Sequence, residues 1–249
     1  MSAGTDRSLK VVWWILGLPP VLFLIAIVIA SIVVASTWAG TNAGSDPNAI
    51  AVAVSGATPW LLLGVQLALL GLLWAGLRAS GRHWRDLGWL LQPGQTLWRE
   101  VALGAGVGLA LAVAYFTALS PLMIWAQVTV GDYVPAGELL PSLGGALVPF
   151  FLANVVLAPL VEEGLYRGLA LPRLVSRFGQ PVAIALNCFF FGLLHWTGGV
   201  WYVLLTGLIA GGLFGGLTLW RRGLTAAYAA HLALNAAEFV TIAWMMAAA

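Results

Sequence analysis

Charged residues are scarce in this sequence. They make up 8% of its 249 residues, whereas soluble domains typically carry about 25%. Hydrophobic residues make up 61%. So few charges cannot cover a water-exposed surface, which excludes a soluble globular domain, and we expect no nucleic-acid partner. The composition predicts an all-α polytopic protein that crosses the membrane several times.

Cysteine and histidine are scarce as well. The one cysteine, Cys188, lies in an apolar stretch, so a disulfide within the chain is excluded. The chain has three histidines, and neither a Ser–His nor a Cys–His arrangement stands out among them. The apolar run at residues 11–39 is longer than the about 7–15 residues of a cleavable signal peptide, so we expect a retained anchor.

Seven apolar segments reach or approach the about 20 residues needed for a helix to cross a bilayer. Pro19 and Pro20 interrupt the first, so we expect its crossing at residues 20–39. In the sixth, glycines at 207, 211 and 215 have the small-xxx-small spacing that lets helices pack closely. In chain order, the predicted spans are residues 11–39, 50–77, 98–124, 143–170, 181–196, 199–220 and 223–247.

The charges between these spans predict an orientation. The connections at 40–49, 125–142 and 197–198 contain no Lys or Arg and hold Asp46, Asp132 and Glu138 instead. Because cytoplasmic loops are enriched in Lys and Arg, the alternation predicts the N-terminus inside and the C-terminus outside. Residues 78–99 mix arginine with tryptophan and leucine, which predicts a segment along the membrane surface. The basic connections carry Arg7 and Lys10, then Arg78, Arg82, Arg85 and Arg99, then Arg173 and Arg177, and finally Arg221 and Arg222.

Two adjacent glutamates, Glu162 and Glu163, lie inside the fourth predicted span. A carboxylate at the centre of a membrane helix costs about 2.5–3.5 kcal/mol, so the pair needs a partner, a polar cavity or a task. Glu163 and Arg167 are four residues apart and share a helix face, which predicts an ion pair. Glu162 points about 100° away and is expected to face a different neighbour.

More polar side chains follow in the later spans. His195 ends the fifth span on the same stripe as Asn187. His231 and Asn235 are four residues apart in the seventh span and face the same way. Glu238 returns to that face about 10 Å further along the helix, and its role stays open.

This set of residues suits the hydrolysis of a peptide bond without a covalent intermediate. A glutamate can act as a general base on water, with a histidine sharing the proton transfer. A histidine and an amide side chain can donate hydrogen bonds to an oxyanion. The competing chemistry is a zinc site of Glu162, His195 and His231. Because the H-E-x-x-H motif is absent, we favour catalysis without a metal or other cofactor.

Three motifs in this order resemble a known family. The sequence has EExxxR at residues 162–167, FxxxH at 191–195 and HxxxN at 231–235. These are similar to the motifs of the CAAX prenyl protease and bacteriocin-processing (CPBP, or Abi) family of intramembrane glutamic-type proteases. The resemblance covers residues 150–236. It implies an all-helical fold with a conical cavity that opens to the cytoplasm and to lipid.

The resemblance also implies a role for each matching residue. Glu162 would be the catalytic base, assisted by His195, and His231 with Asn235 would stabilise the oxyanion. Glu163 and Arg167 would give structural support. The chain would then divide into N-terminal transmembrane helices at 1–142 and a catalytic four-helix core at 143–249.

The substrate and two rival functions stay open at this point. The resemblance implies a membrane-anchored protein or peptide substrate, cleaved in a C-terminal tail or a leader, and a bacterial inner-membrane location. Relatives act on prenylated C-termini, bacteriocins or the sorting tails of surface proteins, and nothing in the sequence selects among these. The first rival is an inactive scaffold or immunity protein of the same fold. The second is a proton-linked transporter, although the internal repeats typical of transporters are not evident.

Overall fold

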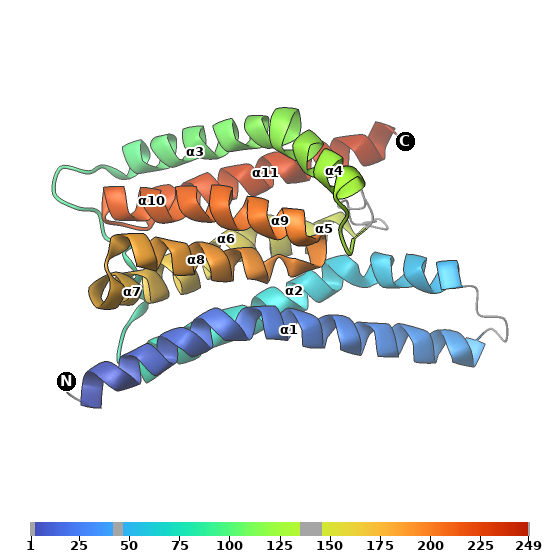
Figure 1. The fold of residues 1–249 in the computed structure, drawn as a ribbon, viewed down its shortest axis with the longest axis horizontal. Helices are drawn as coiled ribbons and strands as arrows, with labels where there is room; N and C mark the ends of the chain where they lie inside the picture. Colours follow the sequence, from blue (N-terminus) through green and yellow to red (C-terminus); the bar gives the residue numbers. More distant parts are fainter. Residues whose placement is uncertain (1–2, 42–46, 135–145, 249) are drawn as a thin grey trace.

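The computed structural model describes residues 3–41, 47–134 and 146–248. Within these ranges the chain forms seven helical rods and no strand (Figure 1). The expected all-helical fold is therefore confirmed. Asp46 and Glu138, which we used to predict the orientation, lie outside the described residues.

The first rod corrects one expectation. α1 (Ala3–Thr41) is continuous through Pro19 and Pro20, which do not interrupt it as expected, and its described part contains an apolar stretch of spanning length at Leu9–Val33. Proline removes one backbone hydrogen bond, but membrane helices tolerate it where local adjustment satisfies the freed carbonyl. α2 (Pro47–Ala79) lies beside α1 and is followed by a short 3-10 turn, η1 (Trp84–Leu87).

Most later rods contain π-helical segments. The third rod joins α3 (Leu97–Ala114), the π segment η2 (Tyr115–Leu119) and α4 (Ser120–Thr129). The fourth joins α5 (Leu147–Phe150), η3 (Phe151–Leu157), α6 (Ala158–Glu162), η4 (Glu163–Ala170) and α7 (Leu171–Phe178), and both η3 and η4 are π-helical. π segments are rare and are frequent at functional sites. The fourth rod contains two π segments and is therefore the strongest candidate to carry a functional site.

The last three rods follow short turns. The fifth is α8 (Gln180–Leu194), and a 3-10 turn, η5 (Trp196–Gly198), follows it. The sixth joins α9 (Val200–Leu205), the π segment η6 (Thr206–Gly211) and α10 (Gly212–Arg221). The seventh is α11 (Thr225–Ala248).

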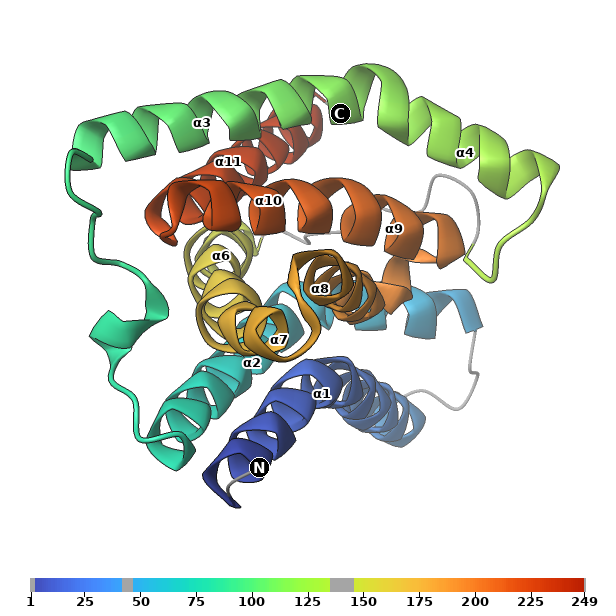
Figure 2. The ribbon, with the colours of Figure 1, turned by 60° about the vertical axis from the view of Figure 1, so that its left-hand side comes forward.

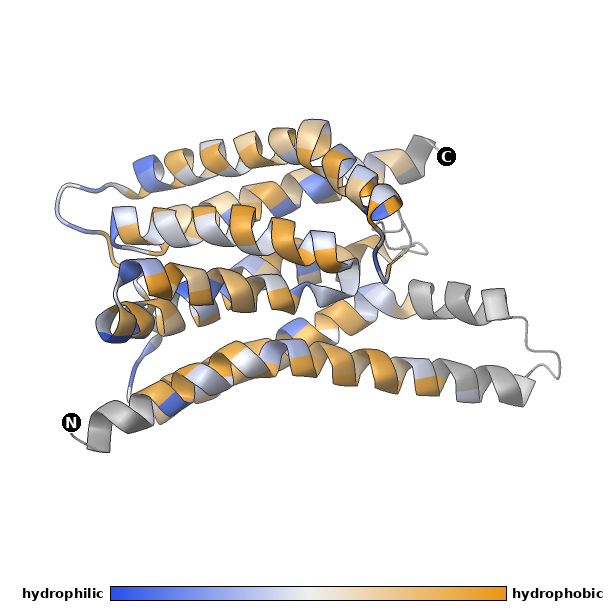
Figure 3. Cartoon of the chain, in the orientation of Figure 1, coloured by the Kyte–Doolittle hydropathy of each residue, from blue (hydrophilic) through white to orange (hydrophobic). Residues whose placement is uncertain are grey.

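Five of the seven rods are long and apolar enough to cross a membrane. They are Leu9–Val33, Gly56–Ala79, Leu97–Thr129, Leu147–Phe178 and Val200–Arg221. α8 has 15 residues, about 22 Å at 1.5 Å per residue, which is shorter than the about 30 Å hydrocarbon core. The described part of α11, which carries His231, Asn235 and Glu238, is not among the five either. The fold is that of a multi-pass membrane protein, and Figure 3 shows apolar residues along the outer rods.

The fourth rod lies at the centre of the molecule. In Figure 2, α6, α7 and α8 are surrounded by α1, α2, α3, α10 and α11. Of the five candidate spans, the fourth rod has the largest buried share, at 56%. Tyr166 and Arg167 are fully buried in it. The part of this rod that carries the two glutamates, residues 161–171, is buried throughout.

Glycines set the spacing between two pairs of rods. A Cβ atom at Gly104 or Gly108 of α3 would lie 2.2 or 2.1 Å from a backbone oxygen of α11. In the predicted stripe of the sixth rod, Gly207 packs against the backbone of α8, whereas Gly215 has open space around it. The close packing predicted for the sixth rod is thus present at its π segment. The closer contact, between α3 and α11, was not predicted.

A polar clamp joins the end of the third rod to the start of the sixth. Asp132 accepts hydrogen bonds from the backbone N–H groups of Val200 (2.9 Å), Trp201 (3.4 Å) and Tyr133 (2.7 Å). The Tyr133 hydroxyl donates to the carbonyl of Trp196. Burial opposes ionisation, but these N–H donors hold the pKa of Asp132 below its ordinary value of 3.8. The clamp fixes the turn that directly follows His195.

Candidate active site

A buried ion pair forms the base of the site. Nη1 of Arg167 donates to Oε1 of Glu163 at 3.1 Å, and both side chains are fully buried. Nη2 of Arg167 donates to the carbonyl of Gly211 at 3.2 Å, and its guanidinium lies 4.0 Å from the ring centre of Phe191. The ion pair predicted from the spacing is present, and it ties the fourth rod to the fifth and sixth.

His231 of α11 meets both glutamates. Its Nδ1 donates to Oε1 of Glu163 at 2.9 Å, and its Nε2 lies 4.0 Å from Oε2 of Glu162. The ring stacks on Phe214, with the two ring centres 4.9 Å apart. We expected the two glutamates to face different neighbours. Glu162 does face Gln66, but both glutamates also meet His231, because an imidazole has a nitrogen on each side of the ring.

Glu162 is the last residue of α6 and is 4% exposed. Its Oε1 accepts a hydrogen bond from Nε2 of Gln66 in α2 at 3.1 Å. Its Oε2 has no hydrogen-bond partner among the described residues. Gln66 thus fixes Oε1 in position, and Oε2 faces His231 without a hydrogen bond from any described residue.

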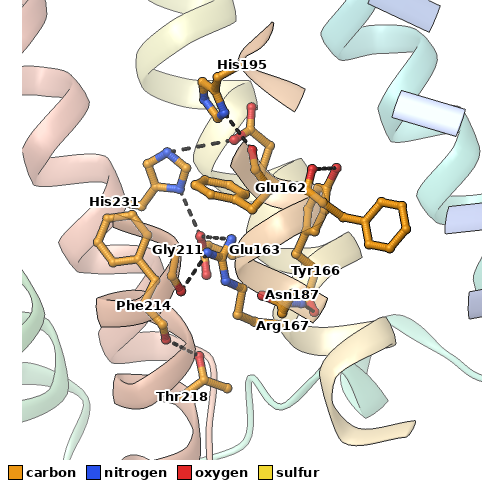
Figure 4. A network of polar contacts seen from close by, with 12 residues as sticks. Glu162, Glu163, Tyr166, Arg167, Asn187, His195, Gly211, Phe214, Thr218 and His231 are labelled. Carbon is orange, nitrogen blue, oxygen red and sulfur yellow. Dashed lines mark hydrogen bonds and ion pairs between the residues drawn. The ribbon is translucent and has the colours of Figure 1, made fainter. Parts of the chain in front are cut away.

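His195 lies just past the end of α8, in the same group (Figure 4). Its Nδ1 lies 2.8 Å from the carbonyl oxygen of Phe191. A carbonyl only accepts, so Nδ1 carries the hydrogen and Nε2 is left free. The ring of Phe191 lies 5.0 Å from the ring of His195 and 6.0 Å from that of His231, centre to centre. Both histidines therefore use Nδ1 to hold their orientation and leave Nε2 for other contacts.

Asn235 extends the site toward η3. Its Nδ2 donates to the carbonyl of Asn154 at 2.7 Å, and Nδ2 of Asn154 donates to Oε2 of Glu238 at 3.1 Å. Asn187, which shares a stripe with His195, donates instead to the carbonyl of Tyr166 at 2.7 Å within η4. Asn187 therefore supports the π segment and does not join the group around Glu162.

The sequence interpretation missed Gln66 and Asn154. Each is an amide in the middle of a predicted apolar span, and polar residues at such positions are usually functional or paired. An amide inside an apolar span was therefore the signal that could have identified them. The sequence alone did not show which of the other spans each amide contacts.

A pocket adjoins the site. Three predicted site residues line it, namely His195, His231 and Asn235. Glu162 does not line it and lies behind His231. The remaining wall is mostly apolar and comes from the third, fifth, sixth and seventh rods, through Leu111, Tyr115, Phe116, Leu119, Phe191, Tyr202, Leu205, Thr206, Ile209, Ala210, Phe214, Leu234 and Glu238.

The zinc alternative required Glu162, His195 and His231 to act as one ligand set. Across the described ranges, no three His, Cys, Asp or Glu side chains are grouped so that they could hold one metal ion. The three side chains are near neighbours of the pocket, but this geometry does not form a ligand set.

The part of the chain that holds the three motifs matches a known family. Residues 144–237 match the family described as type II CAAX prenyl endopeptidase, Rce1-like. The match includes all six predicted site residues, from Glu162 to Asn235. No curated protein and no solved structure matched the chain. Residues 144–237 therefore form a domain of the Rce1-like type II CAAX prenyl endopeptidase (CPBP/Abi) family, as the three motifs indicated.

Proposed function

We propose that the protein is an intramembrane endopeptidase that hydrolyses a peptide bond of a membrane-anchored protein or peptide. Membership of the Rce1-like family supports peptide hydrolysis. The observation that carries the catalytic assignment is the free oxygen of Glu162, 4.0 Å from Nε2 of His231 behind the wall of the pocket.

The catalytic water would lie between Glu162 and the pocket. A separation of 4.0 Å is too long for a direct hydrogen bond, and a single water can bridge it. Glu162 takes a proton from this water while the oxygen of the water bonds to the carbonyl carbon of the substrate. The proton then passes to the amide nitrogen as the carbon–nitrogen bond breaks, which leaves a carboxylic acid and an amine. No covalent enzyme intermediate is needed.

His231 would stabilise the oxyanion in its doubly protonated form. Its Nδ1 hydrogen is already donated to Glu163, so only a second proton on Nε2 lets it donate to the substrate.

The two remaining residues complete the site. His195 presents Nε2 to the pocket and would help to move the proton between the water and the leaving amine. The Nδ2 group of Asn235 has two hydrogens, one of which is used on Asn154, so the other can donate to the oxyanion.

We also propose the orientation predicted from the loop charges, with the N-terminus in the cytoplasm and α8 and α11 as further crossings. Five apolar rods support insertion in a membrane, and the basic connections support the direction. The bacterial inner membrane, with the site in its cytoplasmic half, is the location that fits this proposal.

The test is the substitution Glu162→Gln, which keeps the hydrogen bond to Gln66 and removes the base. Membranes from cells that express the wild type and the variant are compared by mass spectrometry for new protein termini. We expect the wild-type termini to fall at least about 100-fold in the variant, the usual minimum contribution of a general base. Glu100→Gln is the matched control, because Glu100 is also buried but pairs with Arg221 away from the pocket. Termini that survive in Glu162→Gln at wild-type levels would overturn the assignment.

A further inference from the structure

The pocket holds a carboxylate that the catalytic assignment does not use. Glu238 of α11 lines the pocket, one residue beyond the matched domain. Asn154 donates a hydrogen bond to its Oε2 at 3.1 Å. Glu238 makes no ion pair with any described residue.

A carboxylate in a mostly apolar pocket favours a cationic ligand. Removal from water makes an unpaired charge costly, and a bound cation offsets that cost. Asn154 occupies one oxygen of Glu238, which holds the group in place. The apolar pocket wall, with residues such as Leu111 and Ile209, suits the methylene stem of a Lys or Arg side chain.

The position of Glu238 limits where the cation lies in the substrate. Glu238 follows His231 by seven residues on one face of α11, a distance of about 10 Å along the axis. An extended peptide advances about 3.3 Å per residue. A cationic side chain that meets Glu238 would therefore start within about three residues of the bond held at His231.

We propose that Glu238 is a specificity-determining residue that selects substrates with a Lys or Arg within about three residues of the cleaved bond. This rests on the proposed function, because it names the substrate class of the same pocket. A neutral residue at that position would leave Glu238 without a partner, and an acidic one would be repelled.

Binding tests the proposal without any need for cleavage. The purified Glu162→Gln variant in detergent is titrated with fluorescent, N-palmitoylated ten-residue peptides of alanine and leucine. Each peptide carries a single Lys, Gln or Glu, placed at every position in turn, and anisotropy gives the Kd. We expect a run of positions at which Lys binds at least about 10-fold more tightly than Gln, with Glu weakest. Adding Glu238→Gln should reduce the ratio to within about twofold, since charge–charge coupling is then absent.

Tyr115→Phe is the matched control, because it alters the pocket wall and leaves its charge unchanged. It should preserve the ratio of Lys to Gln affinity. Three results would overturn the proposal: no position with a Lys preference, no measurable binding, or a preference that persists in Glu238→Gln. An equal loss of affinity for all three peptides would show that Glu238 only holds Asn154. If the Lys preference is present but the wild-type protein cleaves no substrate, the proposal for Glu238 stands and the endopeptidase assignment is refuted.

Discussion

Gly108 tests whether the packing of α3 on α11 positions the site. A Cβ atom at Gly108 would lie 2.1 Å from the carbonyl oxygen of Ala230, whereas ordinary contact begins near 3.4 Å. Gly108→Ala therefore forces α3 and α11 apart by about 1 Å. Ala230 directly precedes His231, so the same movement shifts the imidazole relative to Glu162.

Two effects of different size follow from this shift. Overpacking of a close contact costs about 1–3 kcal/mol, which lowers the Tm by roughly 2–12 °C for a chain of this length. A misplacement of about 1 Å at a reacting group can reduce the rate about 100-fold. We therefore expect a moderate loss of stability and a much larger loss of cleavage per folded molecule.

Gly106→Ala is the matched control on the same helix. A Cβ atom there has nothing within 4 Å, and alanine favours the helix over glycine by about 1 kcal/mol. Thermal unfolding in detergent and terminus-resolved mass spectrometry of membranes give the two readouts for both variants. If Gly108→Ala unfolds and cleaves like Gly106→Ala, the close contact does not position His231 and the reasoning fails.

Two further predictions concern charged groups. Arg167→Met leaves Glu163 buried without its cation, so we expect a loss of about 3–5 kcal/mol in the free energy of unfolding; chemical unfolding measures it, and Arg167→Met with Glu163→Gln should recover part of the loss. A double variant no more stable than Arg167→Met would show that the uncompensated carboxylate is not the cause. Asp132 has a lowered pKa, so its clamp stabilises the fold above pH 3.8, the ordinary value of a carboxyl, and is lost as pH falls through the folded pKa. Asp132→Asn should lower the Tm at pH 7 and match the wild type in strong acid, and an unchanged Tm at pH 7 would refute the clamp.

The sequence was sufficient for the helical fold, and three of the residues it singled out, His195, His231 and Asn235, line the pocket. The motif spacing predicted the pair of Glu163 with Arg167, since an i,i+4 contact depends only on local geometry. The sequence did not predict how Gln66 or Asn154 enters the site, because contacts between distant helices depend on packing that no local pattern encodes. Gly104 and Gly108 likewise have small-xxx-small spacing, but the spacing does not name α11 as their partner.

Two of the seven predicted spans, those on α8 and α11, are not among the five apolar candidates found in the described residues. α11 carries His231, Asn235 and Glu238, whose side chains line the pocket. α8 ends at Leu194, one residue before His195. A helix that ended further on would keep His195 in regular α geometry, whereas the turn after α8 lets its Nδ1 bond the carbonyl of Phe191. Helices that build a polar site depart from the apolar pattern on which span prediction depends.

The residues proposed as supporting and those proposed as catalytic form one unit through His231. Imidazole has a nitrogen on each side of the ring, so one histidine can meet Glu163 with Nδ1 and Glu162 with Nε2. Arg167 fixes Glu163, and Glu163 fixes the tautomer and orientation of the ring, as a buried carboxylate does for the histidine of a Ser-His-Asp triad. Because the two glutamates are adjacent, one ring meets both of them, and a single histidine links the ion pair of Glu163 with Arg167 to Glu162.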